Sequence, residues 1–142
     1  MPGIAGETPL DLYIMANSPG EIAGLAGPLV RELRLRAGEI RITIVVPPCQ
    51  YASGEELELG HGIGADRCVN FGGLKNLISE SGEKKKTPPK RLLLHLGGDV
   101  AFSVYASKKL RCPLWVYTSS PRWRFFVGRY FVSGEKFRKR FV

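Results

Sequence analysis

Short apolar runs that alternate with helical segments constrain the fold of this chain more than any other feature. Residues 10–16, 41–46 and 91–96 are largely apolar, have the length of strands, and end at turns that contain glycine or proline. The β-branched run 41–46 is typical of a strand covered on both faces, as in a parallel sheet. We therefore predict an α/β fold: a Rossmann-like parallel sheet with helices on both faces.

The remaining elements follow from periodicity and from turn residues. Further strands are predicted at residues 66–70, 114–117 and 130–132. Helices are predicted from Glu21 to Gly38, at 74–78, at 99–110 and from Gly134 onward. Residues 49–64 are predicted to be irregular or a short helix, and residues 80–91 a polar surface loop.

Pro28 lies inside the first predicted helix. A proline at that position removes one backbone hydrogen bond and clashes with the carbonyl of Gly24. Two outcomes are open: the helix kinks at Pro28, or its regular part begins there with a first-turn proline.

Length and composition exclude several classes of protein. The chain has 142 residues with 44% hydrophobic and 24% charged residues, which is typical of one globular domain. No apolar run is long enough for a transmembrane helix, and the amino-terminal residues do not resemble a secretion signal. The three cysteines are odd in number and widely spaced, which predicts free thiols in a reducing compartment. The two histidines are too few for most metal sites, so we expect no metal and no cofactor.

The positive charge is concentrated near the carboxyl terminus. The formal net charge is +8, and residues 111–142 contain eight Lys and Arg against the single acid Glu135. Interleaved with Trp and Phe, these cations suit an anionic membrane surface or a phosphorylated substrate. They also suit nucleic acid. The alternatives are a solvated helix face with ordinary core aromatics, or a surface that meets an acidic partner.

Three loops follow predicted strands and are expected to meet at one edge of the sheet, where α/β proteins bind ligands. The first, Asn17-Ser18-Pro19-Gly20-Glu21, has small residues that let a ligand approach the backbone at a helix N-terminus. It matches no established nucleotide-binding motif. The alternative interpretation is a tight turn with a helix cap.

The second loop, Gly97-Gly98-Asp99, places a carboxylate behind two glycines. Such a carboxylate could act as a general base toward a hydroxyl nucleophile. The alternative is a helix N-cap, which the residue types alone favour over a catalytic base. His95, inside the preceding strand, is predicted to be a core residue with its hydrogen bonds satisfied rather than a catalyst.

The third loop, Thr118-Ser119-Ser120-Pro121-Arg122, combines hydroxyls with an arginine, which suits phosphate or carboxylate. Trp123 and the two phenylalanines beyond it could pack against a sugar or an acyl chain. They could equally pack at an interface between domains.

Several segments, in order along the chain, resemble lipid-A-disaccharide synthase. Residues 16–24 (ANSPGEIAG) and the helix ending in Leu29-Val30-Arg31-Glu32-Leu33 are similar to the opening of that family. Residues 98–102 (GDVAF) resemble its Asp-Phe/Tyr segment at a strand end. Residues 116–123 (VYTSSPRW) are similar to its Tyr-x-Ser-Pro…Trp segment.

This resemblance implies a GT-B glycosyltransferase with two Rossmann-like domains. The reaction would transfer an acylated glucosamine from a UDP-sugar donor to a glycolipid acceptor at the membrane, without a metal. Asp99 would be the catalytic base. The substrate-binding residues would be Asn17, Ser18, Gly20, Glu21, Gly98, Ser119, Ser120 and Arg122. The family has Asp at the position of Glu21.

Residues 1–142 would form one half of the GT-B fold, the amino-terminal, acceptor-side domain. The donor would be bound mainly by a second domain that this chain lacks, so we expect the chain to be inactive alone. The expected location is the cytoplasm, peripheral to the inner membrane, with a glycolipid and an anionic membrane surface as partners and nucleic acid not favoured. The alternative is a non-catalytic Rossmann-like module that binds anionic lipid or nucleic acid through its basic, aromatic carboxyl terminus.

Overall fold

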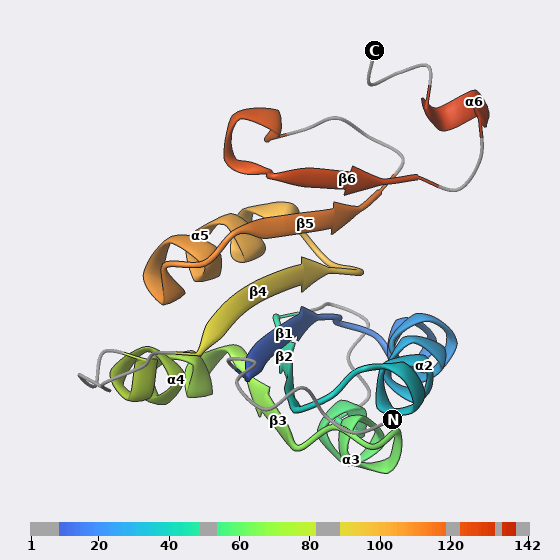
Figure 1. The fold of residues 1–142 in the computed structure, drawn as a ribbon, viewed down its shortest axis with the longest axis vertical. Helices are drawn as coiled ribbons and strands as arrows, with labels where there is room; N and C mark the ends of the chain where they lie inside the picture. Colours follow the sequence, from blue (N-terminus) through green and yellow to red (C-terminus); the bar gives the residue numbers. More distant parts are fainter. Residues whose placement is uncertain (1–8, 49–53, 82–88, 119–122, 133–134, 139–142) are drawn as a thin grey trace.

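The computed structural model contains one six-stranded sheet in which every strand is parallel to its neighbours (Figure 1). It describes residues 9–48, 54–81, 89–118, 123–132 and 135–138. The strand order is β3-β2-β1-β4-β5-β6, the arrangement of a Rossmann fold. The strands are β1 (Leu10–Met15), β2 (Ile40–Val46), β3 (Arg67–Asn70), β4 (Lys90–His95), β5 (Leu114–Tyr117) and β6 (Arg129–Phe131). The predicted fold class is confirmed.

Helices connect most of the strands. The first connection consists of α1 (Pro19–Glu21), a π-helical turn (Ile22–Ala26) and α2 (Gly27–Arg36). The later helices are α3 (Glu56–Gly62), α4 (Leu74–Ser81), α5 (Val100–Leu110) and α6 (Glu135–Arg138), with 3-10 turns at Phe71–Gly73 and Arg124–Phe126. Among the described residues, none of these helices is both long and apolar enough to cross a bilayer.

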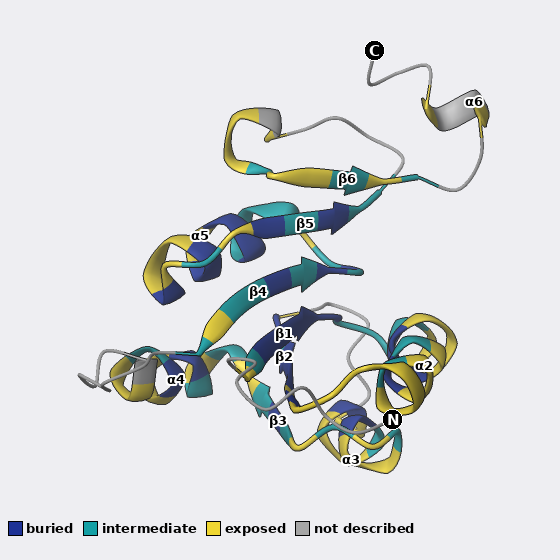
Figure 2. Ribbon diagram, viewed as in Figure 1, coloured by how far each residue is buried: buried dark blue, intermediate teal, exposed yellow. Residues whose placement is uncertain are grey.

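Side chains of the strands alternate between two separate cores, one on each face of the sheet. Figure 2 shows that the central strands β1 and β2 are largely buried. Leu12 and Ile14 pack with Ala26 and Val30 beneath α2. Tyr13 and Met15 point to the opposite face, where α4 and α5 contribute the other core. Helices therefore cover both faces of the sheet around β1, as the sequence predicts.

The structure resolves the two alternatives for Pro28. A π-helical turn over Ile22–Ala26 precedes the proline, and α2 begins at Gly27 with Pro28 in its first turn. The missing N–H of Pro28 therefore falls where an α-helix needs no intrahelical donor. Gly27 is buried, and a side chain on it would touch Ile63, so α2 lies close to the segment after α3.

Most predicted elements are confirmed with small shifts of their ends. The strand at 114–117 has the predicted bounds, and the helix at 99–110 forms with Asp99 as its cap. The segment 49–64 contains α3, and α4 is longer than predicted. Cys68 and Cys112 are free thiols, and burial raises the pKa of each to about 11. Cys49 lies outside the described residues.

Candidate functional site

The strand order reverses direction between β1 and β4, so the carboxyl ends of these two strands form the topological switch point of the sheet. Connections leave β1 and β4 toward opposite faces there, which opens the edge to a ligand. The backbone ties the two ends together: the N–H groups of Leu96 and Gly97 donate to Met15 O at 2.9 and 3.2 Å. The first two predicted loops therefore meet at this edge.

Glu21 joins the two loops through its carboxylate. Its Oε2 accepts the Asn17 N–H at 3.1 Å, while Ser18, the N-cap of α1, accepts the Glu21 N–H at 3.3 Å. The arrangement resembles a capping box, except that Glu21 accepts from the residue before the N-cap and not from the N-cap itself. The same carboxylate lies against the Gly97 backbone, where a Cβ atom would overlap it. Gly97 is thus required for the Glu21 side chain to lie across the switch point.

The carboxyl end of a third strand, β2, also lies at this edge, beside Gly98. Its φ of +91° lies in the region that favours glycine. A Cβ on Gly98 would lie 3.0 Å from Asn17 Nδ2 and 3.2 Å from Pro47 Cγ, so the chain leaving β2 packs here too. The small residues after β4 are explained by this packing, without reference to any ligand.

Asp99 caps α5, as one of its two predicted interpretations requires. Its Oδ1 accepts the Ala101 N–H at 2.9 Å, and its backbone is extended. The residue is exposed at the strand-end edge, so the carboxylate is also accessible to a ligand. The cap is confirmed, and the role as a catalytic base stays a prediction.

His95 lies beneath this edge and is buried, as predicted. Its Nδ1 is 2.7 Å from Ser103 Oγ, a contact that fastens the end of β4 to the first turns of α5. Burial lowers the pKa of His95 to about 4, although the charge of Asp99 and a hydrogen bond to the Gly98 backbone act in the opposite direction. The ring is therefore neutral at pH 7 and acts as a structural contact.

The remaining predicted site residues are Gly20, Ser119, Ser120 and Arg122. Gly20 is exposed and nothing lies within 4 Å of a Cβ placed on it, so the fold leaves room for a side chain at that position. Ser119, Ser120 and Arg122 lie outside the described residues. Within the part of the chain that the structure describes, no group of His, Cys, Asp or Glu could hold a metal ion.

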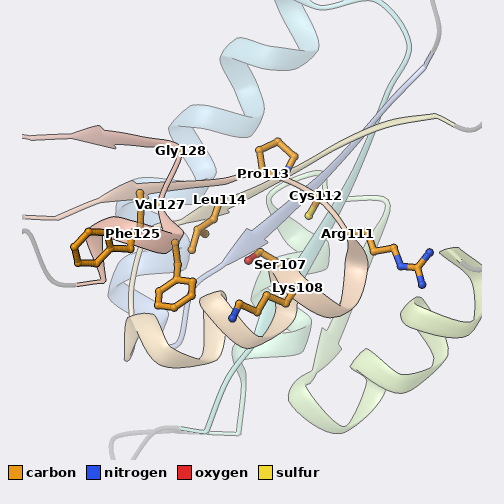
Figure 3. Close-up of a pocket in the computed structure, with 10 residues that line it drawn as sticks. Ser107, Lys108, Arg111, Cys112, Pro113, Leu114, Phe125, Val127 and Gly128 are labelled. Atoms are coloured by element: carbon orange, nitrogen blue, oxygen red, sulfur yellow. The ribbon is translucent and has the colours of Figure 1, made fainter.

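A hollow of about 510 Å³ lies away from this edge, at the C-terminal end of α5 (Figure 3). Its walls include Lys108 from α5, Arg111 directly after α5, and Phe126 from the 3-10 turn before β6. The Lys108 ammonium lies 4.2 Å from the centre of the Phe126 ring, a cation–π contact. This hollow opens beside the amino end of β5, opposite to the end where α/β sheets bind ligands, so we favour the switch point.

Sequence reasoning missed the partners that hold the edge together. It did not single out Gly97 as the seat of the Glu21 carboxylate, nor Pro47 as a neighbour of Gly98. The signal available was the pair of glycines directly after a buried strand. Two glycines at that point indicate that another group packs closely against the backbone, but they do not identify that group.

No model of a known protein family matches the chain, and no curated protein matches it significantly.

Proposed function

We propose that this chain is the acceptor-side, amino-terminal domain of a glycosyltransferase similar to lipid-A-disaccharide synthase. Its reaction would move an acylated glucosamine from a UDP-sugar donor to a glycolipid acceptor. The acceptor would bind at the switch point, with the donor held mainly by a second domain. A position at the inner membrane surface would give access to the acceptor.

One observation carries this proposal: two of the three segments that resemble the family meet at the switch point, where α/β sheets generally bind their ligands. The Asn17–Glu21 loop and the Gly97–Asp99 loop are far apart in sequence, yet the Glu21 carboxylate lies on Gly97. A catalytic base for glycosyl transfer must reach a hydroxyl of the acceptor, and Asp99 is exposed at this edge.

The chemistry assigned to the described residues is simple. Asp99 would accept the proton of the attacking acceptor hydroxyl as the bond to the donor sugar forms and UDP leaves. Ser18 and Gly20, at the N-terminal end of the first connection, would lie against the sugar or its phosphate. The neutral ring of His95 would fix the position of Asp99 through Ser103.

The experiment is a transfer assay with this chain and a separately produced donor-binding domain, given a UDP-linked acylated glucosamine and an acylated glucosamine phosphate. The informative variant is Asp99→Asn, because Asn caps helices as well as Asp does but cannot act as a base. We expect turnover to fall by about 10²-fold or more with the fold intact. Unchanged turnover would exclude Asp99 as the base, and no turnover from the parent chain would overturn the proposal.

A second candidate is a non-catalytic Rossmann-like module that binds anionic lipid or nucleic acid. The hydrogen bond from Ala101 N–H to Asp99 favours it, because the cap explains the carboxylate without any catalysis. It predicts binding with a steep dependence on salt, weakened when Arg138, Lys139 and Arg140 are neutralised. Binding that is absent or independent of salt would exclude this candidate.

A further inference from the structure

A broad apolar trough lies on the α2 side of the sheet, over the four neighbouring strands β1, β4, β5 and β6. Its volume is about 600 Å³, and its lining is almost wholly apolar. One wall consists of leucines of the first connection, and the floor consists of side chains of β4, β5 and β6. The lining residues used below are Leu25, Leu29, Leu92, Leu94, Trp115 and Phe131.

The topology explains why this face is open. Right-handed connections place α2 and α3 on this face over β1, β2 and β3. The connection from β4 to β5 carries α5, whose side chains pack into the other core. The turn before β6 also lies there, because Phe126 is beside Lys108 of α5. Within the described ranges, no helix packs over β4, β5 and β6 on the α2 side.

The trough has the width of a helix. It spans strands β1, β4, β5 and β6, which at roughly 4.8 Å between neighbours is about 14 Å. From the level of Leu10, which pairs with Lys90, to Leu96 it runs along seven residue positions, about 20 Å. A single acyl chain would leave most of this floor in water, whereas an α-helix about 10 Å in diameter and about 13 residues long would cover it.

Cations lie at one end of the trough. Lys90 is exposed at the start of β4, on the same face as Leu92 and Leu94. Arg129, exposed at the start of β6, holds its guanidinium 5.1 Å from the centre of the Trp115 ring. Both are at the amino ends of their strands, where Glu39, before β2, is an exposed acid.

We propose that this trough docks an amphipathic α-helix of a partner protein. The helix would be apolar on one face and carry acidic residues in its last turn. Its C-terminal end would lie at Lys90 and Arg129, since cations favour the negative end of a helix. It would then run in the same direction as α2, against the strands.

A second copy of this chain fits less well. In a two-fold dimer the same surface meets itself, so two concave troughs would face each other without filling. The proposed docking surface begins at Leu96, beside the switch-point edge, but docking there does not depend on glycosyl transfer.

The experiment uses Trp115 as its reporter. The chain has two tryptophans, so the variant Trp123→Phe leaves Trp115 alone to report on the trough. The probe is a synthetic Leu/Ala peptide of about 18 residues, long enough to be helical, with three Glu residues in its last turn. We expect a blue shift of Trp115 emission on binding and an affinity at least about tenfold above that of the same peptide with Lys in place of Glu, a difference that shrinks in salt.

Two variants test the trough surface, and a third serves as a control. Phe131→Glu is expected to weaken peptide binding by about tenfold or more, because it puts a charge on the trough floor. Arg129→Glu is expected to reverse the preference between the Glu and Lys peptides, with circular dichroism confirming the fold of each variant. Phe125→Glu, on an exposed ring beside the α5 hollow, is expected to leave binding unchanged.

Three results would overturn the proposal. The first is no response of Trp115 to millimolar acidic peptide in the folded protein. The second is equal binding of the Glu and Lys peptides with no effect of Arg129→Glu. The third is a Trp115 shift produced by phosphatidylcholine vesicles, or by raised protein concentration alone, in place of the peptide, which would assign the trough to acyl chains or to a second copy.

Discussion

The two halves of the sheet differ in how completely they are covered. In β1 and β2, Ile14, Ile44 and Val45 are fully buried between helices on both faces. In β5, buried residues alternate with half-exposed ones, and in β6 both Arg129 and Phe131 are exposed. Figure 2 shows this change along the sheet, from buried β1 and β2 to exposed β6.

This difference shows which half of the sheet is covered by helices of the chain on both faces and which half has one face open. A parallel sheet normally requires cover on both faces, and the β1–β2 half provides that cover with its own helices. The β4–β6 half has cover on the α5 side only, among the described residues. The candidate site lies at the boundary between the halves, where a rigid strand, β1, meets a strand with one open face, β4.

The largest expected effect is a contrast in core substitutions between the halves. Ile14→Ala removes a fully buried side chain between β1 and α2, and it should lower the free energy of unfolding by about 2–5 kcal/mol. Leu92→Ala, at the half-exposed floor of the trough, should lower it by about 1 kcal/mol, because the truncated side chain was only partly removed from water. Urea unfolding measures both, and equal losses would show that the two halves are packed alike.

The burial of His95 should make stability depend on pH at the boundary. The pKa of His95 is about 4 in the folded chain, below its ordinary value of 6.5. As pH falls, His95 therefore binds a proton in the unfolded chain before it does so in the folded chain. The contribution of neutral His95 to the free energy of unfolding is complete above pH 6.5 and is lost between pH 6.5 and 4. The full loss is roughly 3 kcal/mol.

Urea unfolding at several pH values checks this dependence on His95. The variant His95→Gln should give a flatter profile over the same window, because glutamine does not titrate. An identical profile in the variant would assign the pH dependence to other groups.

A third test concerns the contact between the Glu21 carboxylate and the backbone of Gly97. Gly97→Ala places a Cβ onto the carboxylate at the far end of the Glu21 side chain, which can move aside by giving up its hydrogen bond from the Asn17 N–H, so it should lower the free energy of unfolding by about 1–1.5 kcal/mol. Glu21→Ala in the same chain should recover part of that loss, since the two positions share one contact. Gly20→Ala is the matched control, because a Cβ at that position meets nothing within 4 Å, and it should fold normally. Additive losses at positions 21 and 97 would contradict the contact.

The smallest expected effect separates capping from charge at Asp99. Asp99→Ala removes the cap of α5 and should lower the free energy of unfolding by about 1 kcal/mol. Asp99→Asn keeps an equivalent cap and should leave stability almost unchanged. Thermal unfolding of the two variants makes the comparison, and an equal loss for both would mean that the carboxylate charge, not the cap, stabilises the helix.

The sequence predicted those features that depend on neighbouring residues. The strand at 114–117 and the Asp99 cap both rest on local patterns, apolar runs and turn chemistry, and both are confirmed. The strand order and the contact of Glu21 with Gly97 could not be predicted, because they join residues far apart in the chain and no periodic pattern records such a pair. The π-helical turn before Pro28 was missed for another reason: proline predicts a disturbance of the helix but not which geometry absorbs it.

A two-dimensional NMR titration with an acylated glucosamine phosphate asks whether the switch-point edge is the ligand site. A ligand site at the switch-point edge predicts amide shifts at Ser18, Gly97, Gly98 and Ala101, while Lys108 and Gly128 beside the α5 hollow stay unchanged. Shifts confined to Lys108, Gly128 and their neighbours, with none at Ser18 or Gly97, would contradict it.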